Sequence, residues 1–345
     1  MHPVRKISIL LLGIVLCLSA CSGRKGTERS VSFFAMDTYM TLRAYGCGQE
    51  TLDGLKAETE RLEGLFSVTR PDSEIARLNA EGSIVPSADV RDAVGKALAL
   101  AQESGGALDI ALYPLLTEWG FTTGQYQVPG AERIRELLAA ADWRQIELSD
   151  AGLRIAPGMA LDLGSLAKGY TADVLTKRLK EAGVTSALLD LGGNIQAVGA
   201  KPDGSSWQIG IRDPQGEGHL GVVSAADMAV VTSGGYERYF TGEDGRVYWH
   251  ILDPATGCPA RSGLLSVTVI GSEGWRCDGL STALFVMGPE KAREHWRQAG
   301  NYELVLVTED GEVIVTDGLA GSFTLSQPDK YTLTVWKRDT VRNHD

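Results

Sequence analysis

The sequence predicts an α+β fold, with helices and strands interspersed in one large mixed domain. Apolar residues recur at helical spacing in several segments, and runs rich in Val, Ile, Tyr and Trp are bounded by Gly and Pro. The two kinds of segment do not alternate strictly, as they would in a doubly wound parallel sheet. A chain of 345 residues suits one large domain or two closely joined ones.

Helical spacing marks the expected helices. Apolar residues recur every three or four positions from Leu166 to Leu179, and Gly183 supplies a stop signal. The other expected helices are residues 52–66, 90–103 and 131–141, the segment 277–288, and a further helix from Glu290.

The expected strands are short and β-branched. A strand pair is expected over residues 32–44, and two strands over 186–199 are separated at Gly192–Gly193. Further strands are expected at 207–213, 228–233, 246–252, 264–271, 302–308 and 312–317.

The first residues resemble a bacterial lipoprotein signal. A basic start, MHPVRK, precedes the apolar run 7–20, which is shorter than the about 20 residues that a spanning helix needs. The run ends in LSAC, so residues 1–20 are expected to be removed and Cys21 to receive lipid. Residues 21–31 then form a tether, and 32–345 the folded domain. An ordinary secretory signal or an N-terminal membrane anchor are the alternatives.

Charge and cysteine content exclude several classes of function. A formal net charge of −11 makes sequence-independent nucleic-acid binding a poor fit. After cleavage and lipidation three cysteines remain, Cys47, Cys258 and Cys277, and no CxxC pair exists for a thiolate zinc site. The five histidines include no HExxH motif, so any metal is expected to be a hard cation such as Mg²⁺.

Two oxygen-bearing residues stand four positions apart in CDGLSTALFVMG. On a helix this spacing places Asp278 and Thr282 on one face. Taken alone, Asp278 suits a helix N-cap, and the pair also suits a Mg²⁺ site.

The segment LDLGSLAKGYTADVL supplies a second candidate. It places Asp162 at a strand end, Ser165 in a turn and Lys168 in a first helical turn, which suits an anion. The alternative is a capped amphipathic helix with Lys168 in solvent. Ser165 and Lys168 also match the SxxK pattern of penicillin-binding enzymes, but the partner motifs SDN and KTG are absent.

Two isolated ionisable residues complete the candidates. His250 is expected late in a strand, before the turn at Asp253–Pro254, where it could transfer protons or be a hydrogen-bonded core histidine. Asp109 lies in the apolar segment GGALDIALYPLLTEWGF, so it needs a partner such as a ligand hydroxyl or a backbone donor.

Nine collinear blocks together resemble the ApbE family of FAD:protein FMN transferases, often exported bacterial lipoproteins. The resemblance runs from about Phe33 to about Thr316. The blocks are AMDTYMTL, RPDSEIARLN, GGALDIALYPLLTEWGF, LDLGSLAKGYTADVL, LLDLGGNIQAVG, WQIGIRDP, VTSGGYERYF, HILDPATG and DGLSTALFVMG.

The resemblance implies a reaction and a site. The family transfers FMN from FAD to a threonine hydroxyl of a target protein and releases AMP, on a mixed domain of T-fold-like type. It implies that Asp278, Thr282 and an oxygen of Ser165 bind Mg²⁺, and that His250 is catalytic. The implied FAD-site residues are Met36, Thr69 (where an aromatic residue is usual), Ala107, Leu108, Asp109, Asp162, Lys168 and Ile251.

The resemblance also implies partners and a location. The acceptors would be flavin-bearing subunits of membrane electron-transfer complexes or other exported flavoproteins, met at a bacterial membrane that holds the lipid on Cys21. Two alternatives stay open: a Mg²⁺-dependent FAD pyrophosphatase that forms FMN and AMP, and a non-catalytic FAD-binding lipoprotein.

Overall fold

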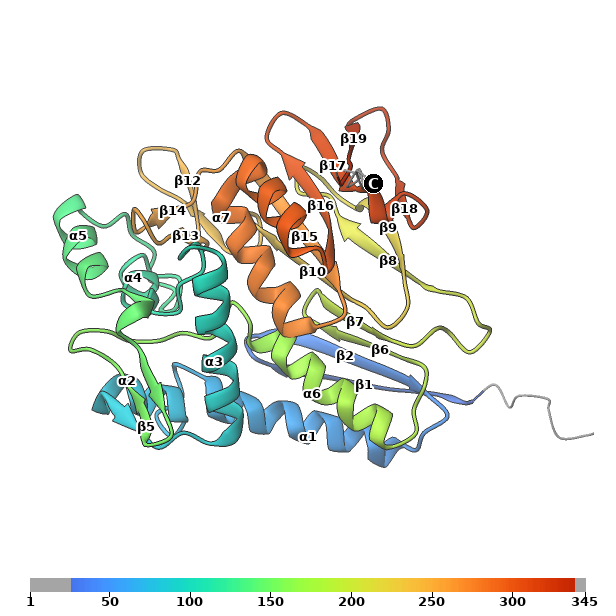
Figure 1. The fold of residues 1–345 in the computed structure, drawn as a ribbon, viewed down its shortest axis with the longest axis horizontal. Helices are drawn as coiled ribbons and strands as arrows, with labels where there is room; N and C mark the ends of the chain where they lie inside the picture. Colours follow the sequence, from blue (N-terminus) through green and yellow to red (C-terminus); the bar gives the residue numbers. More distant parts are fainter. Residues whose placement is uncertain (1–25, 339–345) are drawn as a thin grey trace, which may run out of the picture.

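The computed structural model describes residues 26–338, which are built around one nine-stranded sheet (Figure 1). All neighbouring strands are antiparallel except β17 and β19, which confirms an α+β fold. In sheet order the strands are β1 (Glu28–Ala35), β2 (Thr38–Tyr45), β6 (Ala187–Leu191), β7 (Asn194–Val198), β10 (Ala229–Gly234), β15 (Leu264–Gly271), β16 (Tyr302–Thr308), β17 (Glu312–Thr316) and β19 (Thr332–Trp336).

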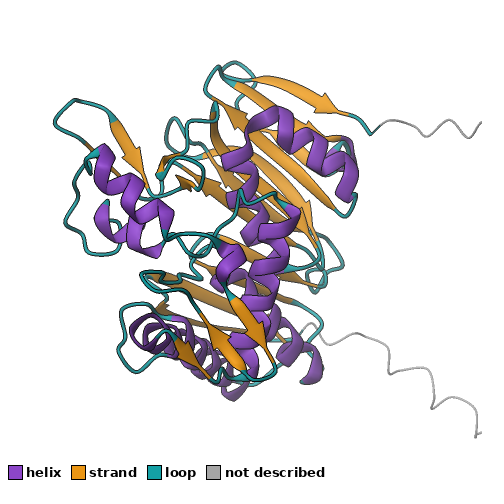
Figure 2. Cartoon of the chain, turned by 60° about the vertical axis from the view of Figure 1, so that its left-hand side comes forward, coloured by secondary structure: helices purple, strands orange, loops and turns teal. Residues whose placement is uncertain are grey.

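The two faces of this sheet are covered differently (Figure 2). Three helices bury one face: α1 (Gln49–Phe66), α6 (Ala167–Glu181) and α7 (Gly274–Ala299). A three-stranded sheet covers part of the other: β8 (Trp207–Arg212), β9 (His219–Ala225) and β18 (Phe323–Leu325). Apolar side chains that alternate along the strands meet both layers, so the core is built from both sides of the sheet.

A side lobe lies beyond one end of the sheet, at the left of Figure 1. Its core joins the end of α1 to the helices and short strands that follow. They are α2 (Glu74–Glu81), β3 (Ser83–Ile84), α3 (Ala88–Glu103), α4 (Tyr113–Glu118), α5 (Ala131–Ala139), β4 (Glu147–Ser149) and β5 (Gly152–Arg154). The short pairs β11 (Tyr239–Thr241) with β12 (Val247–Trp249), and β13 (Leu252–Asp253) with β14 (Cys258–Pro259), lie beside it.

The structure confirms the expected elements, with differences at their ends. β1 begins at Glu28, which pairs with Tyr45, so the predicted tether to residue 31 is wrong at its end. Residues 1–25, with the predicted signal and Cys21, lie outside the described residues. The strand expected over 246–252 is divided into β12, which stops at Trp249, and β13, which begins at Leu252 and pairs with β14 instead of β11.

The predicted boundary inside the last helical region is confirmed as a break in one helix. Gly288 adopts φ 77° within α7, and Pro289 follows it. The elements that were not expected include the short helices α2 and α4 and the strand β9. No helix of residues 26–338 combines the length and the apolar character that crossing a membrane requires. Cys47, Cys258 and Cys277 are free thiols.

Two glycines let α6 and α7 touch at their first turns. A methyl group on Gly169 would lie 2.2 Å from the Gly274 carbonyl oxygen, and one on Gly274 would lie 2.6 Å from that of Gly169. Neither helix has a side-chain cap of its own. Instead, Asp278 of α7 accepts from the Gly169 N–H at 2.9 Å, and Asp173 of α6 accepts from Gly274 at 2.8 Å and Trp275 at 2.9 Å. Each helix therefore caps the other.

We expect Gly169→Ala to lower the free energy of unfolding by about 1–3 kcal/mol, because the added methyl group meets backbone. Gly54→Ala is the matched control, since Gly54 lies exposed in α1 with open space around it, and it should raise stability by about 0.5–1 kcal/mol. Urea unfolding measures both. Equal effects of the two substitutions would contradict the close helix contact.

Candidate functional site

One cavity of about 880 Å³ lies where the side lobe meets the end of the main sheet. Hairpin tips, the turn before α6, the loop after β10 and the first turns of α7 supply its walls. All residues predicted for the site line it: Met36, Thr69, Ala107, Leu108, Asp109, Asp162, Ser165, Lys168, His250, Ile251, Asp278 and Thr282. Segments more than two hundred residues apart in the sequence thus meet at one site.

Asp278 faces the cavity from inside α7 rather than capping that helix. The helix begins at Gly274, so the interpretation of Asp278 as its N-cap is wrong, although the carboxylate does cap α6 through Gly169. Burial raises the pKa of Asp278, and the positive charge of Lys168 and the hydrogen bond from Gly169 oppose that rise. A buried carboxylate needs compensating positive charge, which Lys168 supplies in part and a bound cation could complete.

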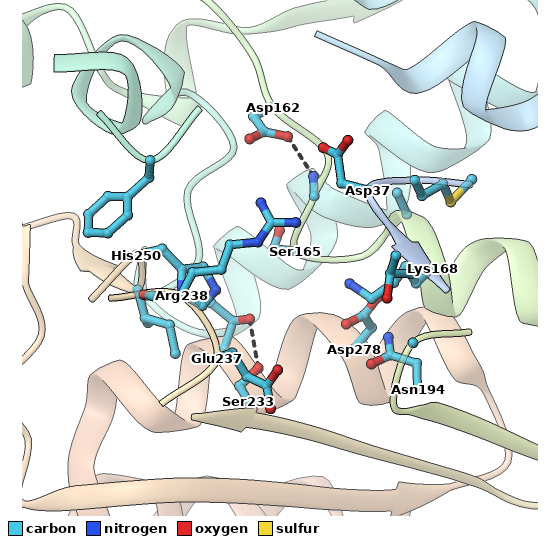
Figure 3. Close-up of a pocket in the computed structure, with 18 of the residues that line it drawn as sticks. Asp37, Asp162, Ser165, Lys168, Asn194, Ser233, Glu237, Arg238, His250 and Asp278 are labelled. Carbon is cyan, nitrogen blue, oxygen red and sulfur yellow. Dashed lines mark hydrogen bonds between the residues drawn. The ribbon is translucent and has the colours of Figure 1, made fainter. Parts of the chain in front are cut away.

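Residues with hydroxyl groups line the cavity together with this carboxylate. Thr282 lies one helical turn after Asp278, and its Oγ1 is 3.3 Å from the Ser233 Oγ. Ser165 lies in the turn before α6 and faces the same space (Figure 3). Within residues 26–338 no group of three His, Cys, Asp or Glu side chains could hold a metal. One carboxylate with hydroxyl and backbone oxygens nevertheless fits the ligands that Mg²⁺ prefers.

His250 presents one ring nitrogen to the cavity. Its Nδ1 is 3.3 Å from the Arg238 carbonyl oxygen, and its backbone N–H donates to the same oxygen at 3.1 Å. Because a carbonyl oxygen only accepts, Nδ1 carries the proton and Nε2 keeps its lone pair. Burial first, and the Arg238 guanidinium second, lower the pKa of His250 to about 4. The ring is therefore a neutral proton acceptor at physiological pH.

Positive side chains line the cavity between the carboxylates. Lys168 lies at the second position of α6 and faces the cavity, so the alternative that placed it in solvent is wrong. Figure 3 shows the Arg238 side chain reaching from His250 toward Asp162 and Asp37. Arg70 and Arg212 line the rim. Such a set suits an anionic ligand.

Arg238 was missed by sequence reasoning, although it lies in the quoted segment VTSGGYERYF. The signal that the sequence offered was an arginine twelve residues before His250.

The other predicted carboxylates are held by backbone donors. Asp109 accepts from Ala111 at 2.8 Å and from Trp143 at 3.2 Å, so its partners are backbone N–H groups. Asp162 accepts from Gly164 at 2.7 Å, which shapes the turn that carries Ser165. Burial raises the pKa of both carboxyl groups.

The tip of the β1–β2 hairpin is a strained turn at the cavity wall. Met36 and Asp37 have φ of 50° and 58°, which side chains other than glycine adopt at a cost of about 1–2 kcal/mol each. Glu63 accepts from the Met36 N–H at 2.7 Å, and Thr171 donates to the Met36 sulfur at 3.8 Å. These contacts fix Met36 at the cavity wall.

The fold and the cavity define a class of protein: a one-domain α+β protein whose cavity at the end of the main sheet is lined by polar, cationic and acidic side chains. The chain belongs to the ApbE family, whose sequence model matches residues 36–306. It is 34% identical to the FAD:protein FMN transferase of Treponema pallidum (strain Nichols), over 89% of this chain and 93% of that protein.

Solved structures agree with this assignment. The flavinyl transferase ApbE of Pseudomonas stutzeri, in its apo form, is 35% identical with a TM-score of 0.75, over 83% of this chain and 93% of that chain. The ApbE protein of Thermotoga maritima has a TM-score of 0.77 at 29% identity, over 88% of this chain and 98% of that chain. The family resemblance drawn from the sequence is confirmed.

The geometry of His250 predicts its titration. In the ligand-free protein we expect the His250 ring to stay neutral from about pH 8 to about pH 5, because its folded pKa of about 4 lies below the ordinary value. NMR of the histidine ring protons measures this, with the His250 signal assigned by its loss in His250→Gln. A midpoint near the ordinary histidine value would contradict the buried, cation-facing environment.

Proposed function

We propose that this chain transfers the FMN part of FAD to a threonine hydroxyl of an acceptor protein and releases AMP. The observation that carries the proposal is the meeting of Asp278, Thr282, Lys168 and His250 in one cavity. Relatives over most of the chain are named for the same transfer.

Asp278, Thr282 and an oxygen of Ser165 would hold Mg²⁺ in this proposal. When bound, the ion neutralises the diphosphate and stabilises the charge that develops on the leaving phosphate. Asp278 and Thr282 lie on successive turns of a helix whose first turn is fixed to α6, so their spacing is set before any ligand arrives.

The chain's own residues supply the proton transfer and hold the ligand. The threonine oxygen forms a bond to the phosphorus on the flavin side, and the bond from that phosphorus to the bridging oxygen breaks. The bridging oxygen leaves with AMP. His250 Nε2 accepts the hydroxyl proton, because its Nδ1–H is directed to the Arg238 carbonyl. Lys168 and the Arg238 guanidinium lie where they can pair with phosphate oxygens.

The remaining predicted residues would contact the two ends of FAD. The walls there would be mixed apolar and polar, formed by Met36, Thr69, Ala107, Leu108 and Ile251. Asp109 and Asp162 form the turns that shape these walls. The cavity volume of about 880 Å³ lies in the upper part of the range that is usual for small-molecule and cofactor sites, about 300–1,000 Å³.

We further propose that the chain acts outside the cytoplasm, anchored by lipid on Cys21. The support is the N-terminal pattern alone. The acceptors would then be exported flavoproteins or flavin-bearing subunits of membrane electron-transfer complexes.

The first test of the function uses the chain from Ser22 onward, FAD and Mg²⁺, with and without a candidate acceptor. We expect covalent FMN on the acceptor by intact-mass spectrometry and AMP by chromatography. Free FMN and AMP with an unmodified acceptor would indicate a pyrophosphatase, in which water replaces threonine. Unchanged FAD would indicate a binding protein. Chelation of the metal with EDTA should stop the reaction, and added Mg²⁺ should restore it.

The metal assignment predicts a charge-specific effect at Asp278. Asp278→Asn keeps an oxygen that can accept from Gly169 but removes the negative charge, so the rate should fall by more than about 100-fold. Asp173→Asn is the matched control, because Asp173 is a half-buried carboxylate that also caps a helix, yet it does not line the cavity. It should keep most of the rate. FMN formation in Asp278→Asn at the wild-type rate would show that the metal assignment is wrong.

A further inference from the structure

The three-stranded sheet that packs on the main sheet ends in an open strand edge. Its order is β18-β9-β8, so β8 has no neighbour on its outer side. Gln208 pairs with Ser224, whose backbone N–H donates to the carbonyl of Ser322 on the opposite side at 2.7 Å. Because backbone groups alternate sides along a strand, the N–H and C=O of Gln208 and Gly210 point away from β9. In the described part of the chain, neither backbone has another hydrogen-bond partner.

The usual protections of an open edge are missing from the middle of β8. Edge strands are commonly guarded by Lys, Pro or a bulge, which prevent pairing with another chain. The outward positions of β8 are Gln208 and Gly210, both exposed and uncharged, with Arg212 only at the end. The bulge of this strand also lies at its end, between Ile211 and Arg212. This edge can therefore accept a further strand.

Two exposed aromatic residues lie on the face of the main sheet that carries β8. Phe34 and Tyr39 are opposite each other in the β1–β2 pair and are 68% and 64% exposed. Tyr39 shares a sheet face with Thr41, because side chains two positions apart on a strand point to the same face. Thr41 is paired with Asp190 of β6, and Asp190 is paired with Ile195 of β7, so all four side chains lie on one face. Ile195 packs into the core beneath β8. The two aromatic rings thus lie on the face that carries β8, on strands that β8 leaves uncovered (Figure 1).

The edge of β8 and this face of the main sheet lead into the cavity already described. Gly210 and Arg212 of β8, with Asp190 and Ile195 of the main sheet, line the cavity as well. Asn194, the neighbour of Ile195, lies beside Asp278 (Figure 3). The groove is the surface between the open edge of β8 and the exposed residues Phe34 and Tyr39. Its inner end is therefore next to the residues proposed to hold the metal.

We propose that the acceptor protein docks an extended segment along β8, pairing with Gln208 and Gly210 above Phe34 and Tyr39. This inference rests on the proposed function. Outward N–H and C=O groups at alternate residues select an extended backbone as the partner, because the N–H and C=O groups of a helix are already hydrogen-bonded within the helix. The groove leads such a segment past Arg212 to the cavity, so a hydroxyl residue at its end reaches the phosphate site. The exposed aromatic rings of Phe34 and Tyr39 would provide contact area for apolar and polar side chains of the docked segment.

A proline substitution tests the backbone pairing. Gln208→Pro removes an outward N–H and leaves the β9 ladder intact, whereas Gln208→Ala keeps the N–H. We expect Gln208→Pro to raise the KM for acceptor by about tenfold or more and Gln208→Ala to change it less than about threefold. The affinity for FAD should equal that of the wild type in both variants, which also shows that both fold. Transfer by Gln208→Pro with an unchanged KM would overturn the proposal.

A second pair of variants and a binding measurement make the test independent of turnover. Phe34→Ser with Tyr39→Ser should raise the same KM, whereas Leu333→Ser, an exposed residue on the opposite edge strand β19, should not. Hydrogen exchange of the wild-type protein with the candidate acceptor should show protection in residues 207–212. Protection elsewhere only, or a second copy of this chain on β8, would overturn the docking even where FMN is transferred. Absence of transfer with protection of β8 would instead contradict the proposed chemistry.

Discussion

The site depends on the contact between the first turns of α6 and α7. Two helices without caps of their own meet at Gly169 and Gly274, and a carboxylate from each binds the free N–H groups of the other. Free N–H groups at a buried helix start are costly, so the two caps stabilise one another's position. Because Asp278 is one of these caps, the residue proposed for the metal is fixed by the fold itself. The contact also brings Ser165 and Lys168, at the start of α6, to the same point.

The remaining walls come from turns that the sheet places at one end. The β1–β2 and β6–β7 hairpins are adjacent in the sheet, and Gly192 lies so close to Thr38 that a methyl group would be 2.1 Å from its hydroxyl. The strain at Met36 and Asp37 is tolerated because Glu63 and Thr171 hold that turn from two helices. The cavity is thus formed by rigid elements whose ends converge, and this fits a site that must position two reacting groups.

Much of this could be predicted from the sequence because the strong signals were local. Apolar periodicity located α6, and the β-branched runs located β15 and β16. The quoted blocks identified the family, and all of the residues matched to it line one cavity. The cap formed by Asp278 could not be predicted, because its donor is 109 residues away and a motif shows only its own helix. The open edge of β8 was equally hidden, since β9 carries weak strand signals and sheet order is a property of the whole chain.

Arg238 links the two halves of the proposed chemistry. Its carbonyl oxygen fixes the proton on Nδ1 of His250, while its guanidinium contributes to the lowered pKa of the same ring. A neutral histidine with such a low pKa is a weak base. A diphosphate that pairs with the guanidinium would offset the part of the pKa lowering that arises from its positive charge, whereas the larger part, which arises from burial, would stay. The ring would therefore become a better proton acceptor once the anionic ligand is in place. The negative net charge of the chain does not oppose this, because charges beyond about 8–10 Å are screened at physiological ionic strength and the ring responds to its neighbours.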